Sequence, residues 1–208
     1  MDRSSAFDED ECGAWQHRVA EPWTTPEFCR CWPGATVWLT GLPSSGKTTI
    51  ARGVAQELHA RGRRTEILDG DENRKLLSAG LGFGKEDRLT NVRRVGLMSE
   101  VLARNGILVL VPVIAPYTVA RAEVRARHTA SDTAFLEVHV DAPLEVCRER
   151  DVKGLYARQA AGRLSGLTGV DDPYEPPLAP ELRIETHRLN IDESVDSLLL
   201  ALAERGLA

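Results

Sequence analysis

The feature that most limits how this chain folds is a glycine-bounded loop close to the start of its regular part. The pattern G-x-x-x-x-G-K-[ST] is met by Gly41-Leu42-Pro43-Ser44-Ser45-Gly46-Lys47-Thr48. A β-rich apolar segment over 35–40 precedes the loop, and a helical apolar pattern over 47–61 follows it. A strand, a tight loop and a helix in this order direct backbone N–H groups and the helix N-terminus at a phosphate. The sequence therefore predicts a phosphate-binding loop.

The side chains of this loop predict ATP and Mg²⁺ as its ligands. Lys47 would reach the β- and γ-phosphate oxygens, and the hydroxyl of Thr48 would be a Mg²⁺ ligand. We expect the nucleotide to contact Gly41, Ser44, Ser45, Gly46, Lys47, Thr48 and Thr49. GTP-dependent switches share this loop but usually carry an Asn/Thr-Lys-x-Asp element late in the chain. The sequence contains no such element, which favours a kinase.

The rest of the chain alternates between strand and helix patterns. Further strands are predicted over 65–68, 107–114, 134–140 and 183–186. Further helices are predicted over 86–104, 119–129, 143–150 and 192–205, with Asp141 as the N-terminal cap of the third. Alternating strands and helices with a continuously apolar central strand indicate an α/β fold. We expect a parallel sheet with helices on both faces.

Two stretches interrupt this alternation and set the expected domain organisation. Residues 1–34 contain scattered prolines and charges without apolar periodicity, so we interpret them as an irregular leader before one domain over 35–208. Residues 151–180 are rich in glycine, proline and charge. We interpret the part over about 151–169 as a mobile lid.

Composition narrows the partners and the compartment. A net charge of −5 gives no overall field that would attract nucleic acid or an anionic membrane. The longest apolar run, 107–116, is about half as long as a membrane-spanning helix requires. Four unevenly spaced cysteines do not suggest a disulfide framework. The expectation is a cytoplasmic protein that binds small molecules and neither nucleic acid nor membrane.

A pair of carboxylates follows the second predicted strand, in Asp69-Gly70-Asp71. In an open parallel sheet, the carboxyl end of a strand is where ligands lie. One carboxylate there could hold Mg²⁺ or its water, and the other could accept the proton of an attacking hydroxyl. The alternative is an acidic turn that merely ends the strand.

Cationic, amide and aromatic side chains cluster in the sequence after this pair. If 86–104 is helical, Arg88 and Asn91 share one face, where they could hold an anionic nucleotide. Phe83 could stack on a base, and Arg74 lies three residues beyond Asp71. Each arginine taken singly is equally consistent with a solvated surface.

These blocks together resemble the adenylylsulfate kinases, which phosphorylate the 3′-hydroxyl of adenosine 5′-phosphosulfate. The resemblance spans about 35–202 and includes the phosphate-binding loop, Leu81-Gly82-Phe83, Lys153-Gly154-Leu155-Tyr156 and Asp171-Asp172-Pro173-Tyr174-Glu175. It implies a P-loop NTPase fold, a homodimer, and ATP and Mg²⁺ as cofactors. It also implies catalysis by Asp71 as general base with Lys47 and Asp69, and Mg²⁺ at Thr48 and Asp69. The implied substrate-binding residues are Arg74, Phe83, Arg88, Asn91, Ile114, Lys153 and Leu155.

The sequence departs from the family's usual pattern at several positions, among them Ser78-Ala79-Gly80 where the family usually has Asn-x-Asp. The family usually has Ser and Arg where this chain has Ala115 and Thr118, and Phe where it has Leu167. No phosphoserine can form at Ala115, so direct in-line transfer is expected. These departures leave open a related kinase with another nucleotide or alcohol as acceptor. A non-catalytic nucleotide-binding regulator is a third reading, against which the intact Lys47 and Asp71 argue.

Overall fold

The structure is a computed structural model that describes residues 32–70, 72 and 77–208. The predicted leader therefore lies almost entirely outside the described residues, as do Asp71 and Arg74. The strands are β1 Ala35–Thr40, β2 Thr65–Ile67, β3 Leu108–Pro112, β4 Ala134–Asp141 and β5 Leu182–Glu185. The helices are α2 Lys47–Ala60, α4 Lys85–Ala103, α5 Thr118–Ala130, α6 Leu144–Arg150, α7 Leu155–Ala160 and α8 Ile191–Ala203.

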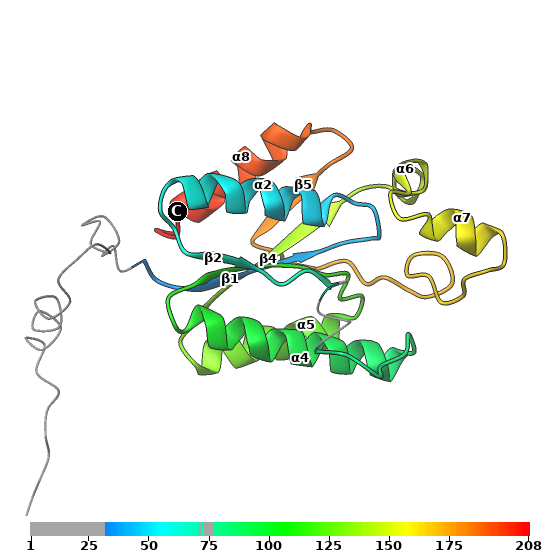
Figure 1. Cartoon of the computed structure of the whole chain (residues 1–208), viewed down its shortest axis with the longest axis horizontal. Coiled ribbons are helices and arrows are strands. Elements are labelled where there is room, and N and C mark those ends of the chain that lie inside the picture. The colour runs from blue at the N-terminus through cyan, green and yellow to red at the C-terminus, as the bar shows by residue number, and fades with distance from the viewer. Residues whose placement is uncertain (1–31, 71, 73–76) are drawn as a thin grey trace, which may run out of the picture. The chain divides into compact units, whose positions relative to one another are not determined.

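The five strands form one parallel sheet in the order β2-β3-β1-β4-β5. Helices α2 and α8 cover one face of the sheet, and α4 and α5 cover the other (Figure 1). The predicted α/β fold with helices on both faces is thereby confirmed. Because all strands run in the same direction, the loops after β1, β2, β3 and β4 meet at one edge.

Two apolar clusters hold the layers together because side chains alternate along each strand. In β1, Val37 and Leu39 pack toward α2 and α8, whereas Trp38 packs toward α4 and α5. All residues of β1 and β3 are buried, as expected for strands covered on both faces. The predicted apolar runs are therefore inner strands of the sheet. β1 leads into the phosphate-binding loop, and β3 leads into the loop before α5.

Most element boundaries lie within a residue or two of the prediction, but two details differ. The short helix α7 was not predicted within the segment over 151–180. Asp141 does not cap α6: it is the last residue of β4, and its carboxylate pairs with Arg183 at 2.5 Å. Among the described residues, no helix has the length and apolar character needed to cross a membrane.

A buried histidine links α5 to the sheet and predicts how stability depends on pH. His128 is fully buried, its Nδ1 lies 2.8 Å from the Val124 carbonyl and its Nε2 lies 2.8 Å from the Thr36 hydroxyl. Since a carbonyl only accepts, Nδ1 donates, and the neutral ring satisfies both contacts. Burial lowers the pKa of His128 below its ordinary value.

Protonation of His128 therefore favours unfolding. Above the ordinary histidine pKa the ring is neutral in both states and costs nothing. As the pH falls through that value the unfolded chain takes up a proton that the folded chain does not, so stability decreases. We expect the melting temperature of the wild type to fall more between pH 7.5 and about pH 5.5 than that of His128→Gln. Equal pH slopes in thermal unfolding would contradict this assignment, since every other titrating group is shared by the two proteins.

Candidate active site

A cavity of about 870 Å³ lies at the carboxyl edge of the sheet. Its walls come from the loop after β1, the residues after β2, the loop after β3, helix α4, the start of the segment over 151–180 and the region around the start of α8. The lining residues that sequence reasoning had proposed are Ser44, Gly46, Lys47, Thr48, Thr49, Asp69, Arg88, Asn91, Ile114, Lys153 and Leu155. One cavity therefore brings the phosphate-binding loop together with five of the seven residues expected to bind the second ligand.

Close packing explains the first glycine of the phosphate-binding loop, and backbone conformation explains the second. A Cβ added to Gly41 would lie 2.3 Å from the carbonyl oxygen of Val140 in β4, so the loop can leave β1 only through glycine. Gly46 has φ 105°, a left-handed conformation that a side chain disfavours, and it is the N-cap of α2. Gly41 and Ser45 do not line the cavity and instead shape the loop from behind.

The ammonium group of Lys47 is held inside the loop. Its Nζ donates to the carbonyl oxygens of Gly41 at 3.0 Å and Leu42 at 2.6 Å, and lies 3.4 Å from the Ser45 hydroxyl. Lys47 is only 8% exposed and lines the cavity at the N-terminus of α2. A buried cation at a helix N-terminus attracts a polyanion through two effects, the side-chain charge and the helix dipole.

Two residues outside the predicted motifs support this loop, Thr186 directly after β5 and Arg150 at the end of α6. The hydroxyl of Thr186 donates to the carbonyl of Ser45 at 2.8 Å. Arg150 donates to the Thr186 hydroxyl at 3.0 Å and to its carbonyl at 2.6 Å. Both line the cavity, as do Val152, Leu189, Asn190, Ile191, Asp192 and Ser194. Sequence reasoning missed this wall, because its residues lie in segments that carry no local motif.

The Thr48 hydroxyl and the Asp69 carboxylate lie side by side, with Thr48 Oγ1 donating to Asp69 Oδ2 at 3.1 Å. Both line the cavity. Hydroxyl and carboxylate oxygens are the hard ligands that Mg²⁺ takes, and the ion usually completes its shell with water and phosphate. This pair therefore fits the predicted metal position, whereas Asp71 lies outside the described residues.

Arg88 links the opposite wall to a distant part of the chain. Its guanidinium donates to the Phe83 carbonyl at 2.7 Å, to the Asp172 carboxylate at 3.0 Å, to the Thr168 hydroxyl and to the Gly166 carbonyl. Arg88 is 7% exposed and lines the cavity. The predicted ligand-facing arginine thus also fastens the loop 166–172 to α4.

Only some of the other predicted substrate-binding residues line the cavity. Asn91 lines the cavity one turn beyond Arg88, and its Oδ1 accepts from the Ser78 hydroxyl at 2.6 Å. Ile114 lines the cavity in the loop after β3. Phe83 is 62% exposed and is not a lining residue of this cavity. Arg74 lies outside the described residues, so the roles of Arg74 and Phe83 stay predictions.

The segment after α6 packs on the phosphate-binding loop through its own apolar cluster. The buried members of this cluster are Ala142, Cys147, Tyr156 and Leu167, and Leu42 packs against them. The Tyr156 hydroxyl also donates to the Pro43 carbonyl at 3.0 Å. Asp151 accepts from the N–H groups of Tyr156 and Ala157, which fixes the start of α7. This packing places Lys153 and Leu155 at the cavity wall.

Sheet, loop and cavity together define the class of the protein. A parallel sheet whose central strand leads into G-x-x-x-x-G-K-[ST], with a hydroxyl and a carboxylate paired beside the lysine, is the arrangement of a P-loop kinase. A second polar wall, with Arg88 and Asn91, belongs to the same cavity.

The chain belongs to the adenylylsulphate kinase family, whose model matches residues 33–185. It is 52% identical over 171 residues to a probable adenylyl-sulfate kinase of Synechocystis sp. (strain ATCC 27184 / PCC 6803 / Kazusa), covering 82% of this chain and 94% of that relative. It is 53% identical over 173 residues to the adenylyl-sulfate kinase of Synechococcus sp. (strain JA-2-3B'a(2-13)). That match covers 83% of this chain and 97% of that relative.

Solved structures agree with this assignment. The Mycobacterium tuberculosis APS kinase CysC, solved in complex with AMPPNP and APS, is similar with a TM-score of 0.80 and 42% sequence identity. The similarity covers 82% of this chain and 98% of that chain. The family resemblance inferred from sequence motifs is thereby confirmed.

Proposed function

We propose that the protein transfers the γ-phosphate of ATP to the 3′-hydroxyl of adenosine 5′-phosphosulfate, giving 3′-phosphoadenosine 5′-phosphosulfate and ADP. The observation that carries this proposal is the shared cavity, which holds Lys47 and Thr48 on one side and Arg88 and Asn91 on the other. The relatives named above for this activity, which are about half identical over four-fifths of the chain, support the acceptor.

ATP binding is assigned to the phosphate-binding loop and to the wall beside it. The N-terminus of α2 and Lys47 receive the phosphates, because they combine backbone N–H groups with a buried cation. Thr48 and Asp69 would hold Mg²⁺, directly or through water. When bound, the ion neutralises charge on the β- and γ-phosphates.

The acceptor is assigned to the wall formed by α4 and the loop after β3. Arg88 provides a cation there, Asn91 an amide, and Ile114 an apolar surface. Asp71 is the proposed base that accepts the proton of the 3′-hydroxyl as the phosphoryl group transfers. Because Ala115 offers no hydroxyl, a direct in-line transfer follows.

The segment over about 151–169 is proposed to act as a lid. Lys153 and Leu155 line the cavity from this segment, and loop 166–172 is fastened to Arg88 on the acceptor wall. One segment thus contacts both binding regions, which suits a device that excludes water during transfer. A homodimer and a cytoplasmic location stay predictions.

An assay of ADP formation with and without adenosine 5′-phosphosulfate tests the proposed function. We expect ADP to form only when both this acceptor and Mg²⁺ are present, with equal amounts of ADP and 3′-phosphorylated product. If another nucleotide or a sugar alcohol is phosphorylated rapidly and adenosine 5′-phosphosulfate is not, the proposed acceptor is wrong. ADP formation that is the same without any acceptor would contradict a kinase.

A further inference from the structure

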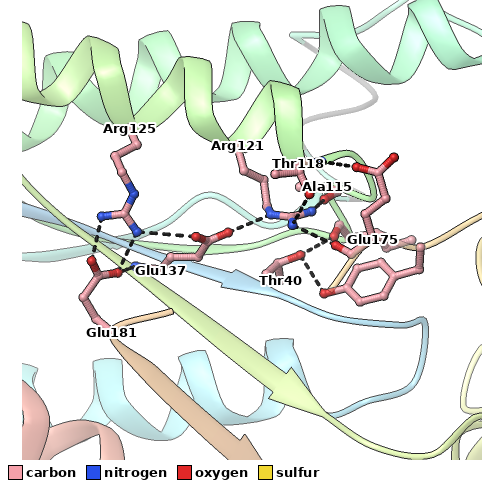
Figure 2. A network of polar contacts seen from close by, with 10 residues as sticks. Thr40, Ala115, Thr118, Arg121, Arg125, Glu137, Glu175 and Glu181 are labelled. Carbon is pink, nitrogen blue, oxygen red and sulfur yellow. Dashed lines mark hydrogen bonds and ion pairs between the residues drawn. The ribbon is translucent and has the colours of Figure 1, made fainter. Parts of the chain in front are cut away.

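A buried arginine lies at the centre of a polar network beneath the acceptor wall (Figure 2). The side chain of Arg121 on α5 is 2% exposed. Its guanidinium donates to Glu137 Oε1 at 2.7 Å, to the Ala115 carbonyl at 2.7 Å, to the Thr118 hydroxyl at 3.2 Å and to the Glu175 carbonyl at 2.7 Å. One side chain therefore joins α5, β4, the loop after β3 and the chain that follows the proposed lid.

The loop after β3 needs this support because its backbone is strained. Ala115 has φ 42°, a left-handed conformation that a residue with a side chain disfavours. Its carbonyl is held by Arg121, and the carbonyl before it, that of Ile114, accepts from the Thr40 hydroxyl at 2.5 Å. Ile114, Ala115 and Pro116 all line the cavity. The shape of the acceptor wall thus depends on contacts made behind it.

Residues 174–175 are fastened to the same loop. The N–H of Glu175 donates to the Pro116 carbonyl at 2.9 Å, and its carboxylate accepts from the N–H of Thr118 at 2.7 Å. The Tyr174 hydroxyl lies 3.1 Å from Thr40 Oγ1. Since the Thr40 hydroxyl already donates to Ile114, Tyr174 is the donor in this contact. The chain leaving loop 166–172 is therefore fixed against the acceptor wall.

We propose that Arg121 is a positioning residue for the phosphate acceptor, an inference that rests on the proposed function. It holds the Ile114–Pro116 wall in its left-handed turn and fixes the end of the proposed lid to that wall. Arg121 does not line the cavity and acts through the loop. Loss of Arg121 therefore weakens binding of adenosine 5′-phosphosulfate and leaves ATP binding intact.

Arg125, one turn further along α5, provides a matched control. It shares the partner Glu137 at 3.4 Å and pairs with Glu181 at 2.6 Å and 2.7 Å. Figure 2 shows Arg125 and Glu181 at one end of the network and Ala115, Thr118 and Glu175 at the other, with Glu137 between them. In the described part of the chain, the side-chain hydrogen bonds of Arg125 go to Glu137 and Glu181 and not to the acceptor wall.

The test compares Arg121→Met with Arg125→Met in the full-length chain by steady-state kinetics and thermal unfolding. In Arg121→Met, Glu137 still has Arg125 as a partner, so the fold is expected to survive. We expect the KM for adenosine 5′-phosphosulfate to rise about tenfold or more, and the KM for ATP to change by less than about twofold. Arg125→Met is expected to lower the melting temperature and change both KM values by less than about twofold.

Arg121→Lys separates positioning from structural support. An ammonium can pair with Glu137, but it lacks the planar fork that spans Glu137, Ala115 and Glu175. We expect its melting temperature to be near that of the wild type while the KM for adenosine 5′-phosphosulfate stays raised. If Arg121→Met does not fold, the KM and the melting temperature of Arg121→Lys are sufficient to test the proposal.

Three outcomes would overturn the inference. The first is an unchanged KM for adenosine 5′-phosphosulfate in the Arg121 variants, and the second is a KM that follows the melting temperature across all three variants. Either result, with an active wild type, leaves the proposed function standing. The third is a wild type that does not phosphorylate adenosine 5′-phosphosulfate, which overturns the proposed function and the inference together.

Discussion

Lys47→Ala is expected to reduce phosphoryl transfer by about 10³-fold or more. Lys47 is the one cation in the sequence of the phosphate-binding loop, and it is buried at the N-terminus of α2 where the phosphates are expected to bind. Charge develops on the phosphoryl oxygens during transfer, so a fixed cation there stabilises the transition state more than the bound substrate. The maximal rate and the affinity for ATP should both fall.

The measurement is the rate of ADP formation at saturating adenosine 5′-phosphosulfate over a range of ATP concentrations. Arg52→Ala is the matched control, because Arg52 is an exposed cation on the same helix and does not line the large cavity. Turnover near that of the wild type in Lys47→Ala would show that the loop does not bind the transferred phosphate.

Asp71→Asn is expected to lower the maximal rate by roughly 10² to 10⁴-fold while ATP binding changes little. The substitution keeps the shape of the side chain and removes its capacity to accept a proton. Asp71 lies outside the described residues, so this prediction rests on its sequence position two residues after Asp69 and on the family resemblance. Rates at saturating concentrations of both substrates and equilibrium binding of ATP are the measurements.

Asp69→Asn separates the two carboxylates. Because Asp69 contacts Thr48 at 3.1 Å, its substitution should raise the Mg²⁺ concentration needed for half-maximal rate. Asp71→Asn should leave that concentration unchanged. Loss of ATP affinity in Asp71→Asn, with the rate at saturation preserved, would make Asp71 a metal ligand and exclude it as the base.

The parts of the fold that could be predicted are those whose signal is local. β1 and β3 are continuous apolar runs because both faces of the sheet are covered, and burial on both faces confirms this. α7 could not be predicted, because its six residues are too short for a periodic pattern and its position depends on Tyr156 packing into a distant cluster. Asp141 was wrongly predicted as a helix cap, because its partner Arg183 lies in another strand.

The residues of the candidate site could likewise be predicted only where their signal is local in the sequence. Lys47 and Thr48 were identified because the spacing within their loop is itself the chemical requirement, and Asp69 because it directly follows a predicted strand. Arg150 and Thr186 were missed because they support the loop from segments far away in sequence. The double role of Arg88 was also not visible, since Asp172 and Gly166 lie about eighty residues further along the chain.

The apolar cluster under the proposed lid affects how often the cavity opens to admit substrates and release products. Tyr156 and Leu167 are buried against Leu42 of the phosphate-binding loop, so the segment cannot swing away without exposing them. Full exposure of a large apolar side chain costs about 1.5 to 3 kcal/mol, and two such side chains make the open state a small minority. Entry of substrates and escape of products then wait for that minority state. We therefore expect product release to depend on this opening, which the dependence of the maximal rate on solvent viscosity would measure.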